Sequence, residues 1–242
     1  MERKVFLKNS LGMIGISGAL LAACKKEAAG TADTTTNTNS TGSCVVSPTE
    51  TEGPFPYPSG EANNPLQRID VTEGQTGLPL SLTITVVDTN NNCALVSNAR
   101  VDIWHCNKDG YYSGYGGQPG ILGTQNYTGK TWLRGYQLTG TGGQVAFTTI
   151  YPGWYSGRAT HIHAEVFVNN VMKKTTQMAF PEPISNAVHL TSLYAAHGIN
   201  TTTNAADGIF GGSASDLAAE MLTLNGDTNT GYSGSITIGL SL

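Results

Sequence analysis

The stretch Tyr155–Val168 reads YSGRATHIHAEVFV, and the interpretation of this chain starts there. Its last residues, Ala164–Val168, are typical of a β-strand. On a strand, residues i and i+2 point to the same face, with Cα atoms roughly 6.5–7 Å apart. His161 and His163 can therefore direct both imidazoles at one ion, and Tyr155 can add an anionic oxygen.

A His-x-His pair alone is equally consistent with two polar residues on the solvated face of an edge strand. A second alternative adds Glu165, which shares their face, to form the 2-His-1-carboxylate set of ferrous oxygenases. Three such residues span about 13 Å along a strand, too far to reach one ion easily. We therefore expect Glu165 to be a surface or supporting carboxylate, and tyrosines to complete the site.

The surrounding sequence carries a wider pattern. Its pieces are Thr51–Phe55, Val101–Gly114, Leu133–Gly135 and Gly142–Trp154, in that order before the histidines. Together they resemble the intradiol ring-cleavage dioxygenases, the catechol and protocatechuate 3,4-dioxygenase family, and most closely its exported single-domain members. The resemblance extends from near Cys44 to the C-terminus and implies a Greek-key β-sandwich.

The resemblance also implies a non-haem Fe(III) held by two tyrosines and two histidines. Tyr155, in the Pro-Gly-x-Tyr turn, matches the axial tyrosine that leaves the iron when substrate binds. His161 matches the axial histidine and His163 the equatorial one. Tyr112, eight residues after Trp104, matches the tyrosine that stays bound. Phenolate is a hard anionic ligand, which suits the hard ferric ion.

Two further residues are expected beside the reacting ring. Arg158 matches an arginine that stabilises developing charge, an electrostatic role, and Gln177 matches an active-site glutamine after a one-residue gap. The implied reaction cleaves a catechol-type ring with O2 to a cis,cis-muconate-type product. A non-catalytic surface-exposed binding module with an unused metal site is the main alternative, and a zinc hydrolase using His161 and His163 is a weaker one.

The remaining histidines and cysteines do not have the spacing that is typical of metal ligands. His105 is expected in the core or behind a ligand, and His189 and His197 fall in a loop-rich region. One disulfide is plausible in an oxidising compartment, with one thiol left over, and spacing alone does not choose the pair. The three candidates in the mature domain are Cys44, Cys93 and Cys106.

Composition points to an exported, turn-rich β-protein. Of the 242 residues, 12% are charged and 30 are glycine, and the formal net charge is −4. Because nucleic-acid binding needs clustered basic residues, a nucleic-acid partner is not expected.

The N-terminus is a targeting segment. Residues 1–23 combine basic residues with a short apolar run that ends in Leu21–Cys24, which resembles a bacterial lipobox. Cleavage before Cys24 would leave a lipidated cysteine anchoring the protein to the membrane of the cell envelope, whereas a simple signal peptide is the alternative. Arg3–Lys8 also resembles a twin-arginine export signal with lysine in place of the second arginine. Residues 24–43 are predicted to be a flexible tether.

Residues 44–242 are expected to form one all-β catalytic domain, a Greek-key β-sandwich with long active-site loops and little helix. A helix is expected over Ser215–Thr223, and Tyr111–Trp132 and Pro181–Gly212 are expected to be long loops that line a binding site. The predicted strands are Leu80–Val87, Arg100–Trp104, Gln144–Ile150, His161–Val168, Met172–Phe180 and Ser235–Leu242.

Overall fold

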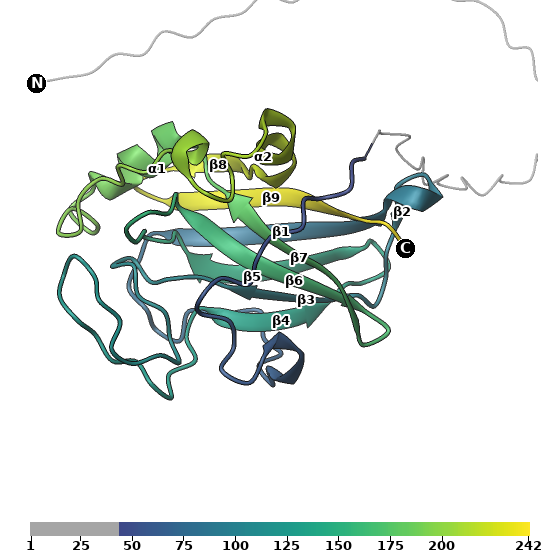
Figure 1. Ribbon diagram of the computed structural model, residues 1–242, viewed down its shortest axis with the longest axis horizontal. Coiled ribbons are helices and arrows are strands. Elements are labelled where there is room, and N and C mark those ends of the chain that lie inside the picture. The colour runs from purple at the N-terminus through teal and green to yellow at the C-terminus, as the bar shows by residue number, and fades with distance from the viewer. Residues whose placement is uncertain (1–43) are drawn as a thin grey trace, which may run out of the picture. The chain divides into compact units, whose positions relative to one another are not determined.

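The computed structural model describes residues 44–242, which form two β-sheets packed face to face (Figure 1). The alternation in β1 (Pro79–Asp88) shows how the sequence builds this sandwich. Leu80, Leu82, Ile84 and Val86 are all buried, whereas Pro79 and Ser81 are exposed. Since every second residue of a strand faces the same way, these four aliphatic side chains form one wall of the core.

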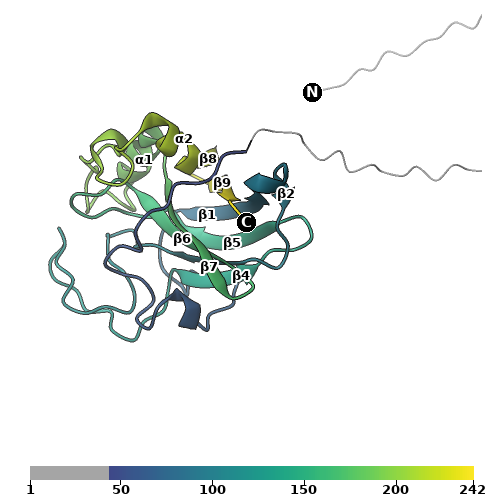
Figure 2. The same ribbon diagram turned by 45° about the vertical axis from the view of Figure 1, so that its right-hand side comes forward.

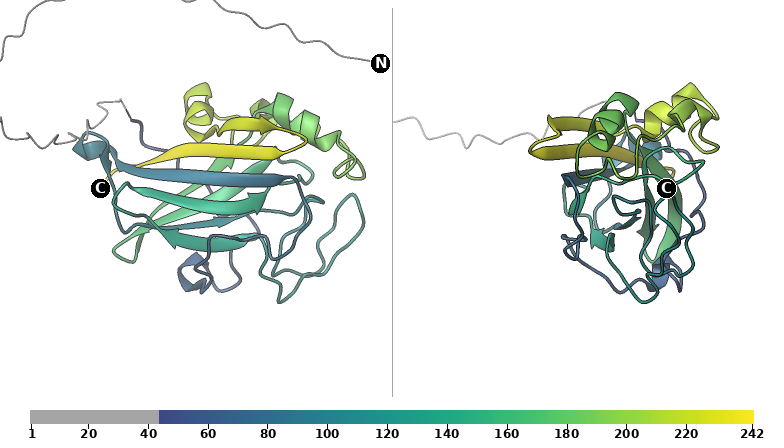
Figure 3. Two further views of the ribbon diagram at one scale, coloured as in Figure 1. Left: turned by 180° about the vertical axis from the view of Figure 1, so that it is seen from behind. Right: turned by 90° about the vertical axis from the view of Figure 1, so that its left-hand side faces the viewer.

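The first sheet is built around β1 and β9, which are parallel neighbours although they lie at opposite ends of the domain sequence. β1 also pairs antiparallel with β5 and, at its far end, with β2, while β9 pairs with β8. Figure 3 shows β9 in yellow beside β1 in blue and β5 in teal. The bounds are β2 Ala94–Leu95, β5 Gln144–Ile150, β8 Thr223–Asp227 and β9 Gly231–Leu240.

The second sheet has the order β4-β3-β6-β7 and is antiparallel throughout. Its bounds are β3 Arg100–Trp104, β4 Arg134–Leu138, β6 His161–Val168 and β7 Val171–Ala179. The chain crosses between the sheets after β2, β4, β5 and β7, and the predicted all-β Greek-key sandwich is confirmed. β6 is a central strand, and His161 and His163 are 2% and 1% exposed. The solvated edge-strand alternative is therefore wrong.

Helical content within residues 44–242 is small, as expected, but one helix was not predicted. α1 (Glu182–His189) occupies the start of a segment expected to be a loop, with proline in its first turn, where the missing N–H costs nothing. α2 (Ala214–Glu220) begins close to the predicted start and is capped by the Ser213 side chain. Figure 2 shows both helices near β8, along one side of the domain. β2, β4 and β8 were also missed.

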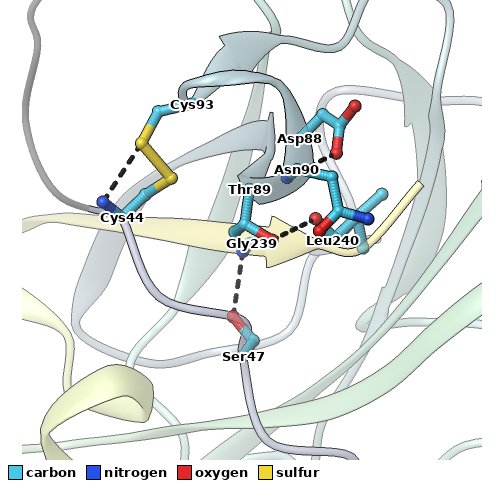
Figure 4. The surroundings of a disulfide bond; sticks show 8 residues. All are labelled: Cys44, Ser47, Asp88, Thr89, Asn90, Cys93, Gly239 and Leu240. Atoms are coloured by element: carbon cyan, nitrogen blue, oxygen red, sulfur yellow. Dashed lines mark hydrogen bonds between the residues drawn. A yellow bond between two sulfur atoms is a disulfide. The ribbon is translucent and has the colours of Figure 1, made fainter.

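The segment 44–58, called here the N-terminal segment, is attached across the second sheet. A disulfide joins Cys44 to Cys93, and Ser47 hydrogen-bonds to Gly239 in both directions (Figure 4). The buried Lys174 ammonium donates to the Ser47 carbonyl, at 2.7 Å, and to the Thr49 hydroxyl. The structure thus decides the disulfide pairing that the sequence left open, and Cys106 remains a buried free thiol.

The predicted signal peptide (1–23), the lipidated Cys24 and the tether (24–43) lie outside the described residues. Within the described part of the chain, no helix is long and apolar enough to cross a membrane.

Candidate active site

The predicted site residues meet where β3 ends and β6 begins. The antiparallel register places Trp104 opposite His163, and His163 opposite Gln177 of β7. Two loops leave the sheets at this same end of the sandwich, the left-hand end in Figure 1. The β3–β4 loop carries Tyr112, and the β5–β6 loop carries Tyr155 and Arg158. Segments that are far apart in sequence therefore contribute to one place.

Four side-chain donor atoms converge at this place. His161 Nε2 lies 3.1 Å from His163 Nε2, 3.3 Å from the Tyr112 hydroxyl and 3.2 Å from the Tyr155 hydroxyl. These residues are called the ligand cluster below. Two imidazole nitrogens and two phenol oxygens that face one point form a donor set suited to a metal ion.

The tautomer of His161 is set by its backbone. Its Nδ1 lies 2.6 Å from the Ala159 carbonyl oxygen, which can only accept, so Nδ1 carries the proton and donates it. Burial, followed by the nearby Arg158 charge, lowers the pKa of His161 to about 3. The ring is therefore neutral at physiological pH, and its Nε2 lone pair points into the cluster. A metal-binding histidine is commonly oriented by such a second hydrogen bond.

The His163 ring is fixed by close packing. It stacks on the Trp104 indole, with ring centroids 4.9 Å apart and an interplanar angle of 5°. Gly53 also lies close to this ring, since a Cβ there would sit 3.0 Å from His163 Cε1, and its φ is +69°. Glycine meets both demands at this position, the positive φ and the absent side chain.

The two tyrosines lack a positive partner strong enough to ionise them. Burial raises the pKa of Tyr112 well above its ordinary value and raises that of Tyr155, although Arg158 opposes both effects. A multivalent cation at the centre of the cluster would supply the charge that the phenolate forms require. Phe55 of the N-terminal segment stacks on Tyr112 at 4.7 Å and helps to exclude water.

The carboxylate alternative fails on geometry. Among residues 44–242, no group of three or more His, Cys, Asp or Glu side chains is arranged to hold a metal ion. Glu165 is buried and accepts a hydrogen bond from the Thr175 hydroxyl at 2.9 Å. The donor set of this chain thus fits a hard, highly charged metal ion through its tyrosines, and not the 2-His-1-carboxylate pattern.

Arg158 is held from two sides. Its Nε donates to Asp207 Oδ2 at 2.9 Å, and its Nη2 donates to Gln177 Oε1 at 2.6 Å. The remaining nitrogen, Nη1, lies 3.4 Å from His161 Nε2. Gln177 is fully buried and donates in turn to the Thr51 carbonyl. The geometry therefore places Arg158 and Gln177 beside the ligand cluster.

Asp207 was not foreseen from the sequence. Its side chain is fully buried and also accepts hydrogen bonds from the backbone amides of Ala159, Ile209 and Phe210. The Phe210 ring lies 5.8 Å from the Arg158 guanidinium carbon. One carboxylate thus fixes both the arginine and the aromatic residue beneath it.

Arg134 performs a similar role behind Tyr112. It is 1% exposed and donates to the Phe55 carbonyl at 2.8 Å and to the Ser113 carbonyl at 2.9 Å. Its nearest carboxylate is that of Glu61, 3.8 Å away. Arg134 therefore links the backbone of Ser113, the residue after Tyr112, to the backbone of Phe55, whose ring stacks on Tyr112.

The other histidines lie outside the cluster. His105 is buried, with Nδ1 donating to the Cys106 carbonyl and Nε2 next to the Thr149 hydroxyl, which is the core role expected for it. His189 and His197 are buried near Tyr194 and Trp154 respectively.

Comparison with known proteins agrees with this arrangement. No family model and no curated sequence matches the chain. Among solved structures, an intradiol ring-cleavage dioxygenase from Tetranychus urticae is 27% identical, with a TM-score of 0.71 over 81% of this chain and 94% of that one. The dioxygenase domain of a dioxygenase carbohydrate-binding protein fusion from Streptomyces sp. SirexAA-E is 23% identical, with a TM-score of 0.58 over 82% and 99%.

A 3-chlorocatechol 1,2-dioxygenase from Rhodococcus opacus is 18% identical, with a TM-score of 0.56 over 80% of this chain and 72% of that one. The chain thus has the β-sandwich fold of solved intradiol ring-cleavage dioxygenases, and these enzymes are its structural neighbours.

Proposed function

We propose that this protein is an iron(III)-dependent intradiol dioxygenase that cleaves a catechol-type ring with O2. The observation that carries the proposal is the convergence of Tyr112, Tyr155, His161 and His163 on one point. The similarity to the dioxygenase from Tetranychus urticae, over most of both chains, supports it.

In the proposed reaction, both atoms of O2 enter one catechol molecule. The bond between the two hydroxylated carbons breaks, and the product is a cis,cis-muconate-type dicarboxylate. A bound ferric ion would hold the catechol as its dianion and make the ring reactive toward O2.

The chain's own residues have distinct parts in this proposal. The Tyr155 side chain, as its phenolate, would take up one of the two protons of the incoming catechol as it gives way, because phenol and catechol protons have comparable acidity, and the second proton would pass to solvent. Tyr112, fully buried beneath Phe55, stays in place. Arg158 holds its positive charge beside the reacting ring, fixed in advance by Asp207 and Gln177, so that it stabilises charge without reorganising.

Metal content and colour test this proposal. The purified protein should contain about one iron per chain and absorb broadly in the visible, through charge transfer from phenolate to iron. Tyr112→Phe should shift that band or lose the iron. The matched control is Tyr111→Phe, since that hydroxyl donates to the Gly123 carbonyl outside the cluster. Stoichiometric zinc without a visible band would refute the dioxygenase and favour a hydrolase or a binding module.

We further propose that residues 44–242 are the catalytic domain and that Cys24 carries a lipid anchor in the cell envelope. The support is the sequence itself, in which Cys24 follows small residues at the end of a short apolar run. Residues 24–43 would then be the tether between membrane and enzyme.

A further inference from the structure

A cavity of about 350 Å³ lies beside Tyr155, at the same end of the sandwich as the ligand cluster. It is formed by the start and middle of the β3–β4 loop, the β5–β6 loop and the segment after α1. Its volume falls within the range of roughly 300–1,000 Å³ that is usual for small-molecule pockets. Its lining residues are Asp109, Gly110, Pro119, Gly120, Ile121, Trp154, Tyr155, Ser156 and His197.

The walls of this cavity suit a flat apolar group. Pro119 and Ile121 provide aliphatic surface, and the indole of Trp154 provides an aromatic one. The Trp154 ring is held in place because its Nε1 donates to the Gly198 carbonyl at 3.0 Å. A cavity lined by an aromatic ring and aliphatic side chains favours an aromatic ligand, since the apolar area that it buries and its ring contacts both stabilise binding.

The His197 imidazole extends the aromatic wall. It is 5% exposed and packs against Trp154 with ring centroids 4.5 Å apart. Its Nδ1 makes no hydrogen bond within residues 44–242, but this nitrogen has almost no accessible surface and is not offered to a bound molecule. His197 therefore contributes apolar ring area to the cavity.

Tyr155 is the wall that this cavity shares with the ligand cluster, since its hydroxyl lies 3.2 Å from His161 Nε2. The proposed function requires Tyr155 to give way when a catechol binds. A Tyr155 ring that moved away from the cluster would open the cavity toward the position of the reacting ring. The cavity is therefore placed to receive a group attached to that ring.

We propose that this cavity binds the substituent of the substrate, and that the preferred substrates are catechols carrying a second aromatic ring. The inference rests on the proposed function and narrows it to a substrate class. Catechol itself would use only the ligand cluster and Arg158, and would leave the wall formed by Trp154 and His197 without contacts.

The test compares 4-phenylcatechol with catechol as substrates of the iron-loaded protein. The wild-type protein should favour the two-ring compound in kcat/KM by on the order of tenfold. Ile121→Trp fills the cavity from its exposed rim and should remove most of this preference. Leu122→Trp is the matched control, because Leu122 is the next residue, is also exposed and does not line the cavity.

Calorimetry without O2 provides a readout that is independent of turnover. The two-ring compound should bind more tightly than catechol to the wild type and to Leu122→Trp, and should lose this advantage in Ile121→Trp.

The outcomes separate this inference from the function on which it rests. Turnover of catechol with the same substrate preference in Ile121→Trp as in Leu122→Trp would overturn the inference and leave the dioxygenase in place. Failure of both compounds to consume O2 would remove the proposed function and the inference together.

Discussion

Arg158 shows at the scale of single residues how this site is prepared in advance. Its guanidinium is oriented by Asp207 on one side and by Gln177 on the other, and its third nitrogen faces the ligand cluster. An arginine held in this way loses little freedom when charge develops on the substrate. The charge of Arg158 and its fixed position should therefore both contribute to the rate.

A double-mutant cycle between Arg158 and Asp207 tests this coupling. Arg158→Ala should keep the iron and its colour but lower kcat by on the order of 10²–10³. Asp207→Asn should lower kcat less, by about tenfold, because the charge remains and only its position is loosened. Because Asp207 acts through Arg158, the double variant should be no slower than Arg158→Ala alone. Additive losses in kcat, at equal iron content, would show that Asp207 acts independently.

The sequence predicts the ligand cluster better than the residues that support it. The histidine spacing and the motif positions identify Tyr112, Tyr155, His161 and His163, and the structure brings these four together. Asp207 lies 49 residues from Arg158 and follows no local pattern. Contacts between residues this far apart depend on the conformations of the connecting loops, and the periodicity of the sequence does not predict those conformations.

At the scale of elements, the N-terminal segment connects the fold to the site. It begins at the Cys44–Cys93 disulfide, is fixed to β7 by Lys174, and then carries Gly53 over His163. Gln177 holds its backbone at Thr51. A segment that starts at the edge of the first sheet thus forms one wall around the ligand cluster.

Removal of the disulfide should destabilise this arrangement. The bridge closes a loop of 49 residues, and replacing both cysteines by serine should cost about 2–4 kcal/mol of the free energy of unfolding. Thermal melts should therefore show a lower Tm for the double serine variant. A reductant should lower the wild-type Tm to a similar value and leave the variant unchanged. An unchanged Tm in the variant would contradict the stabilising role of the bridge.

α2 is joined to β7 through a buried carboxyl. Glu220 is 1% exposed, its Oε1 accepts from the Thr176 hydroxyl at 3.4 Å, and its Oε2 has no partner among the described residues. Burial, and then the charge of Glu50, raises the pKa of Glu220 to about 8. Between pH 4.5 and 8 the folded protein therefore keeps a proton that the unfolded chain releases, so the contribution of Glu220 to stability falls as pH rises.

Glu220→Gln should remove that dependence. The variant should match the wild type near pH 5 and be more stable by roughly 1–2 kcal/mol at pH 8, because the amide is neutral at both values. Chemical unfolding at the two pH values measures the difference. If the wild type were the more stable protein at pH 8, Glu220 would have to be ionised and paired in the folded state.

The elements that the sequence predicts are those with strong periodicity. β1 alternates clearly, and β6 is a continuous run of strand-forming residues. α1 was missed because Glu182–His189 includes a proline and lies in a polar stretch, although proline is tolerated in a first turn. The spacing of the cysteines does not decide which two of them form the disulfide. The pairing depends on a tertiary contact, in which the N-terminal segment reaches the loop after β1.

At the scale of the whole molecule, the lipid anchor proposed at Cys24 can be tested directly. Cys24→Ala should leave the protein unprocessed, with its signal segment retained, or processed but without lipid. Two or more acyl chains on Cys24 would anchor the wild type stably. Mass spectrometry of the N-terminal peptide gives the direct readout. Wild-type protein that is wholly soluble and carries no lipid would refute the anchor.

The central claim, intradiol cleavage by an iron(III) enzyme, is tested most directly by the product formed from catechol and isotopically labelled O2. We predict that the iron-loaded protein consumes one O2 per catechol and forms cis,cis-muconate carrying both labelled atoms, and that His163→Ala, which loses a metal ligand, forms none. A yellow semialdehyde product would indicate cleavage outside the two hydroxylated carbons. Such a product, or the absence of O2 uptake by iron-loaded protein with any catechol, would contradict the account.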